Sequence, residues 1–413
     1  MNTEKRDIVI AGGGMVGISL ALKLASALPE SVRIALVEGF ALPEPNAASP
    51  AYHPSFDARS TALSYSSCLI YQDLGLWDEL AEWLCPIDTI HVSSRGRFGS
   101  ALMRAEDYAW PALGYVVENA WFGRVLLDAL RQQGRVELIN PARVAVAEAS
   151  AIGQRLQLEG EGPKEIETAL LLVADGAGSG LRQQLGVAVD NKPYHQHALI
   201  ANVATAQPHG GCAFERFTDE GPLALLPLAG VSGAQHRSAL VWTLPPERAE
   251  SLMSCTQDAF LTAMQDRFGY RLGRFTQVGE RHGYPLALIA SEEQVRQGMV
   301  VMGNAAHSLH PVAGQGFNLA LRDIEALATV LAEGVERGQE LGELRLLRRY
   351  LAVQKADQER TIGLSDRLPE LFMRSDPVTG MARDLGLAVL DIAEPLKREF
   401  VRVAAGVASL GQR

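Results

Sequence analysis

Short apolar runs alternate with longer amphipathic stretches along the chain, and their lengths and spacing predict its elements. Four short runs are almost entirely apolar, which is typical of parallel strands buried on both faces of a sheet. These runs cover residues 7–11, 32–37, 170–174 and 299–302. Between residues 190 and 280 strands and turns alternate, with one helix near 256–268. The chain therefore combines a buried parallel sheet with a second, mostly antiparallel sheet.

Helical periodicity fills the stretches between and after these runs. It predicts helices over residues 15–28, 63–84, 120–132 and 316–334. The remainder of the chain is mostly helical, with breaks at Pro369, Pro377 and Pro395.

This order of elements predicts an α/β fold, α+β overall. A discontinuous Rossmann-like dinucleotide-binding domain carries an inserted β-sheet substrate domain and a helical C-terminal region. A length of 413 residues suits two or three domains of roughly 150 residues each. The ranges that we expect are 1–88, 113–186 and 281–335 for the dinucleotide-binding domain, 89–112 and 187–280 for the β-sheet domain, and 336–413 for the C-terminal helices.

The net charge of the chain limits the classes of partner that it can bind. Asp and Glu number 48 against 38 Lys and Arg, which gives a net charge of −10. A nucleic-acid-binding protein needs a cationic surface that displaces counterions, so we expect no nucleic-acid partner. A phosphate-bearing cofactor is still compatible with this charge, because backbone N–H groups hold phosphates without net positive charge.

The N-terminal segment and the spacing of the cysteines lead us to expect a cytoplasmic protein. The N-terminal segment lacks the apolar core of a signal peptide. The uncharged stretch from Gln297 to Leu321 contains His, Asn, Gln, Pro and several glycines, so we do not expect it to span a membrane. The 4 cysteines have neither zinc-site nor disulfide-framework spacing, which indicates isolated thiols in a reducing compartment.

A glycine-rich turn follows the first buried strand. Gly12, Gly14 and Gly17 fit the pattern GxGxxG between a strand and a helix, and Glu38 ends the second strand. In this context Gly12 permits the tight turn, Gly14 lets a pyrophosphate approach the backbone, and Gly17 allows close helix–strand packing. The helix N-terminus attracts phosphates, and Glu38 would accept hydrogen bonds from an adenosine ribose. The motif predicts a dinucleotide site without separating FAD from NAD.

A second motif follows the buried strand at 170–174. Asp175 and Gly176 begin the pattern DGxxSxxR, which includes Ser179 and Arg182. The pattern suits a second approach to a bound dinucleotide, and it suits equally a simple Asp-Gly turn with Ser179 as a helix cap.

A third motif follows the last buried strand. Gly303 and Asn304 lead into a proline loop, and Gly314 and Gly316 precede a helix. The small residues of this segment leave room for a flat ligand beside the backbone. Its two histidines lack a third partner at metal spacing, so we expect no metal site.

These three motifs, in this order and spacing, resemble the single-component FAD monooxygenases that hydroxylate aromatic rings. That family carries GxGxxG, then DG, then GDAAHxxxPxxGQGxN, and the resemblance extends from residue 7 to about residue 330. It implies FAD as cofactor, NADH or NADPH as co-substrate, and molecular oxygen. One position departs from the pattern: the family's Asp in the third motif is Asn304, whose amide can still hydrogen-bond the ribityl chain.

The resemblance also implies roles for individual residues. Arg59 matches an arginine near the flavin and pyrophosphate, and Asn119 stands where many members contact FAD. Pro311 is expected near the reacting ring, and Arg216 either faces the phenol or flavin or forms a surface ion pair. The cofactor-binding residues that we expect are Gly12, Gly14, Gly17, Glu38, Arg59, Asn119, Asp175, Gly303, Asn304, Gly314, Gln315, Gly316 and Asn318.

Four segments carry a closer resemblance, to the ubiquinone-biosynthesis hydroxylases within this family. They are HVSSRGRFG at 91–99, IANVAT at 200–205, AFERFT at 213–218 and GPLALLPL at 221–228. The first is most similar to members that convert 2-polyprenyl-6-methoxyphenol to 2-polyprenyl-6-methoxy-1,4-benzoquinol. Three alternatives stay open: a sibling hydroxylase acting on another ring carbon, another FAD enzyme on the same scaffold, and a flavin-binding assembly subunit without turnover of its own.

The implied substrate carries a long prenyl tail. Residues 385–404 place apolar side chains beside Lys397, Arg398 and Arg402. This basic amphipathic pattern is compatible with peripheral membrane contact, with a partner in a multiprotein biosynthetic complex, or with a helix packed on its own domain. A homo-oligomer is compatible with the sequence as well.

Overall fold

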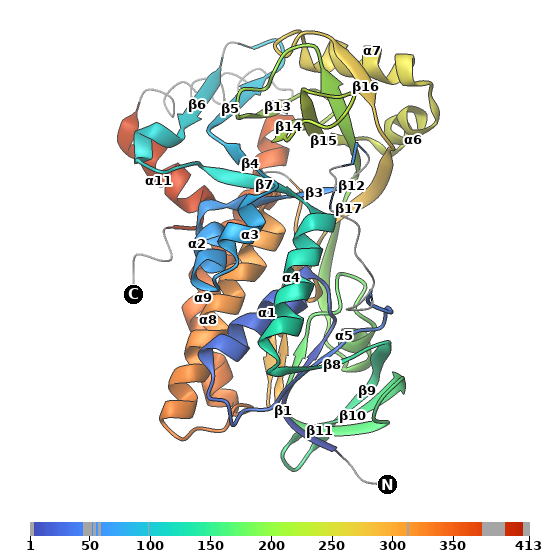
Figure 1. Cartoon of the computed structure of the whole chain (residues 1–413). Coiled ribbons are helices and arrows are strands. Elements are labelled where there is room, and N and C mark those ends of the chain that lie inside the picture. Colours follow the sequence, from blue (N-terminus) through green and yellow to red (C-terminus); the bar gives the residue numbers. More distant parts are fainter. Residues whose placement is uncertain are drawn as a thin grey trace.

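Three β-sheets and a set of long helices make up the fold (Figure 1). The computed structural model describes residues 4–43, 52, 55–56, 59–97, 99–311, 314–373 and 393–407. The mixed α/β architecture with a helical C-terminal region confirms the fold class predicted from the sequence.

The first sheet has eight strands and a parallel centre. Its strands follow the order β18-β19-β11-β1-β2-β8, and a hairpin of β9 and β10 extends it from β11. All four predicted buried runs lie in it, and the pairs β1–β11, β1–β2 and β11–β19 are parallel. The strands are β1 (Glu4–Ala11), β2 (Ile34–Val37), β8 (Val136–Ile139), β9 (Ala142–Ser150), β10 (Gly153–Gly160), β11 (Glu165–Val173), β18 (Val295–Arg296) and β19 (Met299–Val301).

Long helices cover one face of this parallel sheet. Ile8 and Ile10 of β1 point into a core shared with these helices, whereas Val9 points to the opposite face. The opposite face packs against the β9–β10 hairpin and the short helix α5 (Gly180–Gln184). Burial on both faces explains why these strands are apolar runs rather than alternating ones. The covering helices are α1 (Met15–Ala27), α4 (Asn119–Gln133), α8 (Gln315–Glu336) and α9 (Leu344–Met373).

The second sheet has nine strands and is largely antiparallel. Its order is β20-β17-β12-β15-β14-β13-β5-β6, with β16 paired to β12. Helices α6 (Pro246–Ser254) and α7 (Gln257–Phe268) cover its outer face. The strands are β5 (Thr89–Ser94), β6 (Ser100–Arg104), β12 (Val189–Thr205), β13 (Cys212–Phe217), β14 (Pro222–Leu228), β15 (Arg237–Leu244), β16 (Phe275–Val278), β17 (His282–Ser291) and β20 (His307–Ser308).

A third, three-stranded sheet lies between the two larger ones in Figure 1. It consists of β3 (Ser60–Ser64), β7 (Gly114–Glu118) and β4 (Leu84–Ile87) in the order β3-β7-β4. The single helix predicted over 63–84 is therefore wrong at both ends. That stretch holds two short helices, α2 (Tyr65–Asp73) and α3 (Trp77–Ala81), separated at Gly75, whose φ of 71° ends the first of them.

Helix α11 (Glu394–Ala404) is the last helix that the structure describes. Phe400 and Val401 pack into the apolar cluster beneath the nine-stranded sheet. These apolar residues of the basic amphipathic segment therefore contact the protein itself, while residues 385–392 of that segment lie outside the described residues. None of the described helices is long and apolar enough to cross a membrane.

The ranges of the three domains stay a prediction. Strand β5 pairs with β13 of the nine-stranded sheet although more than a hundred residues separate the two in sequence, and β6 joins the sheet by pairing with β5. Strand β17, which begins just after the expected boundary at residue 281, also pairs within this sheet, through β12.

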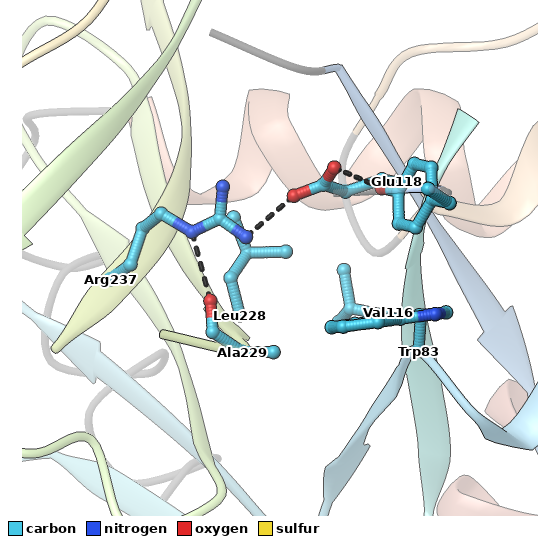
Figure 2. A pocket seen from close by; sticks show the side chains of 7 residues that line it. Trp83, Val116, Glu118, Leu228, Ala229 and Arg237 are labelled. Carbon is cyan, nitrogen blue, oxygen red and sulfur yellow. Dashed lines mark hydrogen bonds and ion pairs between the residues drawn. The ribbon is translucent and has the colours of Figure 1, made fainter. Parts of the chain in front are cut away.

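A buried ion pair joins the three-stranded sheet to the nine-stranded one (Figure 2). The side chains of Arg237 on β15 and Glu118 on β7 are 1% and 5% exposed, and Nη2 lies 2.5 Å from Oε1. Arg237 also donates through Nε to the carbonyl of Ala229 at 3.0 Å, and the Tyr52 hydroxyl donates to Glu118. Burial and then Glu118 raise the pKa of Tyr52 far above its usual value, so this hydroxyl stays a donor.

We expect Arg237→Ala to lower the free energy of unfolding by about 3–5 kcal/mol, because it leaves the Glu118 carboxylate buried without its cation. Arg143→Ala removes an exposed ion pair with Glu159 and should cost less than about 1 kcal/mol. Urea unfolding followed by tryptophan fluorescence measures both variants. Equal losses would show that the buried pair does not hold the two sheets together.

Candidate functional site

Residues of the three motifs meet at one edge of the parallel sheet. Gly12, Glu38, Asp175 and Gly303 each follow the carboxyl end of β1, β2, β11 or β19, which are neighbours in the sheet. In open α/β sheets ligands bind outside this edge. The structure therefore brings together residues that lie almost 300 positions apart in the sequence.

Two of the three turn glycines are required by the protein's own backbone. Gly12 has a φ of 110°, and a Cβ there would lie 2.5 Å from the carbonyl oxygen of Ala174. A Cβ on Gly17 would lie 1.8 Å from the carbonyl oxygen of Gly12. The lack of side chains at both positions lets the first turn of α1 pack closely against the end of β1.

Gly14 is different, because the protein itself leaves room for a side chain there. A Cβ on Gly14 would meet nothing within 4 Å, and the residue is exposed at the N-cap of α1. The open space lies in front of backbone N–H groups at the positive end of a helix, which is where a phosphate binds. This geometry fits the pyrophosphate of a dinucleotide.

The carboxylate of Glu38 lies against the glycine turn. Its Oε2 accepts a hydrogen bond from the backbone N–H of Gly13 at 2.5 Å, and its Oε1 accepts one from Phe40 at 2.7 Å. Glu38 thus stands beside the space in front of α1 with its oxygens turned toward backbone donors. Its expected contact with a ribose stays a prediction.

The second motif is partly structural. Ser179 caps α5 by accepting a hydrogen bond from the N–H of Arg182 at 2.9 Å, which confirms the capping interpretation of this serine. Arg182 is buried and donates to the carbonyl oxygen of Ala305 at 2.7 Å, so it ties the second motif to the third. Asp175 is exposed at the sheet edge, and its Oδ2 lies 3.4 Å from the N–H of Leu181.

The third motif crosses the front of the same space. Gly303 has a φ of 57°, and a Cβ there would lie 3.0 Å from Cγ1 of Val16 in the first turn of α1. Asn304 follows it with an exposed side chain. Gly314, with a φ of 59°, is the N-cap of the 22-residue helix α8, and its N–H donates to the carbonyl of Pro311 at 3.0 Å. A second long helix thus directs its positive end toward the site.

Gln315 and Asn318 are held by the protein. The amide of Asn318 accepts hydrogen bonds from Ser64 N and Ser67 Oγ at 2.8 and 2.7 Å, and it donates to the carbonyls of Ala62 and Gly314. It therefore fixes the start of α8 against β3 and α2. The side chain of Gln315 donates to the carbonyl of Ala404 at 3.1 Å. Direct cofactor contacts of both residues stay a prediction.

Arg59 and Asn119 are neighbours in space. The N–H of Asn119 donates to the carbonyl of Arg59 at 2.8 Å, and its Oδ1 accepts from the Thr61 hydroxyl at 2.7 Å. Arg59 is exposed, and its Nη1 lies 3.2 Å from the hydroxyl of Tyr284 on β17. The guanidinium thus reaches from the residue before β3 to the nine-stranded sheet.

The structure does not bring Arg216 to these residues. Its Nε donates to the carbonyl of Arg267 at the end of α7, at 3.1 Å, on the outer side of the nine-stranded sheet. Burial, followed by the charges of Arg271 and Arg95, lowers the pKa of Arg216. Its catalytic role stays a prediction, as does that of Pro311, which is half-buried beside Gly314.

The sequence reasoning missed a buried network behind the third motif. His307 Nε2 lies 2.8 Å from Asp323 Oδ2, and both side chains are 1% exposed. The other oxygen of Asp323 accepts hydrogen bonds from Gln354 and Gln358, each at 2.8 Å. A charged residue inside the apolar stripe of a predicted helix is the signal that points to Asp323.

A pocket lies on the boundary between the nine-stranded and three-stranded sheets (Figure 2). The Arg237–Glu118 pair forms one side of it, next to Asn119 in sequence. Its lining residues are Tyr52, Trp83, Val116, Glu118, Leu228, Ala229 and Arg237.

Comparison with known proteins now identifies the family. The family described as FAD binding domain matches residues 5–358. The chain belongs to this family. FAD is its cofactor, and the open space at Gly14 fits the dinucleotide part of that molecule.

Relatives of known activity extend this assignment. The ubiquinone hydroxylase UbiL of Rhodospirillum rubrum is 33% identical over 405 residues, which cover 98% of this chain and 90% of that protein. The 3-demethoxyubiquinol 3-hydroxylase of Escherichia coli is 30% identical over 410 residues, 98% of this chain and 100% of that protein. The solved p-nitrophenol 4-monooxygenase of Pseudomonas putida has the same fold, with a TM-score of 0.76 at 19% identity over 97% of both chains.

The chain is thus a flavoprotein aromatic hydroxylase, as the resemblance implies. Enzymes of this class use NADH or NADPH to reduce the flavin. The protein positions the reactants, excludes water from them and provides the charges around them.

We expect Gly14→Val to fold normally and to retain less than about a tenth of the FAD bound by the unmodified protein, since a side chain there fills the space in front of α1. Absorbance of the purified protein measures its flavin content. Gly123→Val is the matched control, because a Cβ on Gly123 also meets nothing within 4 Å but lies in α4, away from the sheet edge. A Gly14→Val protein that is fully loaded with flavin would overturn the assignment of this space.

Proposed function

We propose that this hydroxylase converts 2-polyprenyl-6-methoxyphenol to 2-polyprenyl-6-methoxy-1,4-benzoquinol in ubiquinone biosynthesis, using NADH or NADPH and molecular oxygen. The observation that supports this most strongly is whole-chain similarity to enzymes that hydroxylate ubiquinone precursors, at 30% and 33% identity. The HVSSRGRFG segment at 91–99 favours this ring position.

The chain's own residues supply binding and shielding. Bound FAD, once reduced and exposed to oxygen, supplies the electrophilic oxygen atom. The N-termini of α1 and α8, together with Glu38, would hold its phosphates, ribose and ring system at the sheet edge. The inner surface of the nine-stranded sheet is mostly apolar, and we expect it to keep water from the reacting ring.

A sibling reaction at another ring carbon is the second candidate. It is favoured by the similarity to the 3-demethoxyubiquinol 3-hydroxylase, which covers 100% of that protein. Both reactions take a phenol with a polyprenyl tail, so the site geometry suits either of them. A flavin-binding assembly subunit without turnover of its own is the third candidate, which activity measurements separate from the other two.

A polyprenyl tail is insoluble in water, so the substrate must come from a membrane surface or from a partner protein. Because Phe400 and Val401 of α11 pack within the protein, these two residues are not the apolar surface for such contact. We propose peripheral membrane contact or a multiprotein complex as the route of delivery. The net charge of −10 disfavours binding to nucleic acid.

We expect cells that lose this protein to accumulate 2-polyprenyl-6-methoxyphenol, because the step that consumes it is blocked. Mass spectrometry of lipid extracts identifies the intermediate and its ring substituents. Cells that carry the Gly123→Val protein are the control and should accumulate nothing. Accumulation of an intermediate that already carries the added oxygen would assign the protein to the sibling reaction.

Purified, flavin-loaded protein should consume NADH or NADPH in the presence of oxygen, and a prenylated methoxyphenol should stimulate this consumption. The phenol enhances the rate because it fills the space above the sheet edge and excludes water. Oxygen uptake and product analysis measure the reaction. If no prenylated phenol is hydroxylated, the subunit without turnover becomes the better description.

A further inference from the structure

Glu215 is a carboxyl group on the inner side of the nine-stranded sheet, the side that packs against the three-stranded sheet and α11. It lies on β13, opposite Ala224 of β14 and Val92 of β5. Its sequence neighbours Phe214 and Arg216 point the other way, toward α7, because side chains alternate along a strand. The side chain of Glu215 therefore points to the inner face, the side that carries Val92, Ala213 and Leu226.

One oxygen of this carboxyl lacks a partner in the part of the chain that the structure describes. Its Oε1 is buried and makes no hydrogen bond among the described residues. A buried polar group left unpaired costs about 1–3 kcal/mol, so such a group needs an explanation, and a catalytic role is one. The contrast with Glu118 is direct, since that buried carboxylate meets both Arg237 and Tyr52.

The surroundings of Glu215 are apolar and connect it to the start of α8. Val92, Ala213 and Leu226 belong to the same cluster as Phe400 and Val401 of α11. The last turn of α11 accepts a hydrogen bond from Gln315, the first residue of α8, through the carbonyl of Ala404. Helix α11 thus joins the wall that holds Glu215 to the start of α8.

We infer that Glu215 is the group that accepts the proton of the substrate's phenolic hydroxyl. This inference rests on the proposed function, because it needs a phenol as substrate. A phenol held between the start of α8 and the inner face would present its hydroxyl to an acceptor without a partner and its ring to apolar side chains.

The proton transfer fits the chemistry of ring hydroxylation. The phenolic O–H bond breaks, its proton moves to a Glu215 oxygen, and the electron pair left on the phenolic oxygen enriches the ring. The ring carbon para to that oxygen forms a bond to one atom of O2, and the other atom leaves as water, with two electrons from NADH or NADPH. The hydrogen on that carbon is then lost as a proton. The phenolic oxygen takes up a proton again, and Glu215 releases the proton that it accepted to solvent.

The ionisation of Glu215 suits this role. Burial alone raises the pKa of Glu215 to about 7, since no charged group contributes to the shift. A base with a pKa near the working pH transfers protons most effectively. Among the described residues, the titratable groups on elements packed against this side include Tyr108, Tyr284 on β17, Arg237 on β15, Glu118 on β7 and Lys397 on α11.

The test compares the flavin-loaded protein with Glu215→Gln, Glu215→Asp and the exposed control Glu250→Gln on α6. With a short-tailed 2-prenyl-6-methoxyphenol, we expect Glu215→Gln to lower kcat about 100-fold while KM changes less than about threefold. The unmodified enzyme should gain activity as the pH rises through about 7, because the carboxylate is the active form. This dependence should vanish in Glu215→Gln and persist in Glu215→Asp, whose kcat is intermediate. Unchanged kcat and pH dependence in Glu215→Gln would overturn the inference.

Infrared difference spectra test the contact without turnover. The unmodified protein should show a carboxyl C=O band that titrates near pH 7, that is absent in Glu215→Gln and that shifts when the phenol binds. A band that the phenol leaves unchanged would overturn the inference even if the protein hydroxylates the phenol. A band that shifts in a protein that forms no product would support the contact and instead overturn the proposed function.

Discussion

The close approach of two backbone segments at the first turn is the constraint on which the site depends. The carbonyl oxygen of Gly12 occupies the place that a Cβ on residue 17 would need, 1.8 Å away. This contact places the N-terminus of α1 directly at the carboxyl end of β1. The open space at Gly14 exists because α1 starts there. An acidic chain can therefore hold an anionic dinucleotide through backbone dipoles rather than through cationic side chains.

The nine-stranded sheet completes the site by its placement above that edge. Its two faces serve different purposes: the outer face packs against α6 and α7, while the inner face looks toward the three-stranded sheet and α11. The Arg237–Glu118 pair fixes the distance between the sheets with both charges compensated. By contrast, Oε1 of Glu215 on the inner face has no hydrogen-bond partner among the described residues, and a bound phenol would relieve the cost of leaving it unpaired.

Much of the fold was predictable from local pattern. The buried parallel strands are continuous apolar runs because helices cover one face and a hairpin the other, and periodicity alone located them. The stretch at 63–84 was not predictable as a single helix, because its ends pair as strands with β7, a long-range contact that local periodicity does not report. The β9–β10 hairpin was not predicted either, although its pairings join strands that follow one another along the chain.

The sequence by itself determined the family, the cofactor and the turn at Gly12, Gly14 and Gly17, because spacing along a strand–turn–helix unit is a local property. Only the tertiary structure decided which side chains share a surface. Arg216 and Glu215 are adjacent in sequence, yet Arg216 contacts α7 and Glu215 lies on the opposite, inner face of the sheet. The side of a strand that becomes the inner face depends on which elements pack against it, and those elements come from distant parts of the chain.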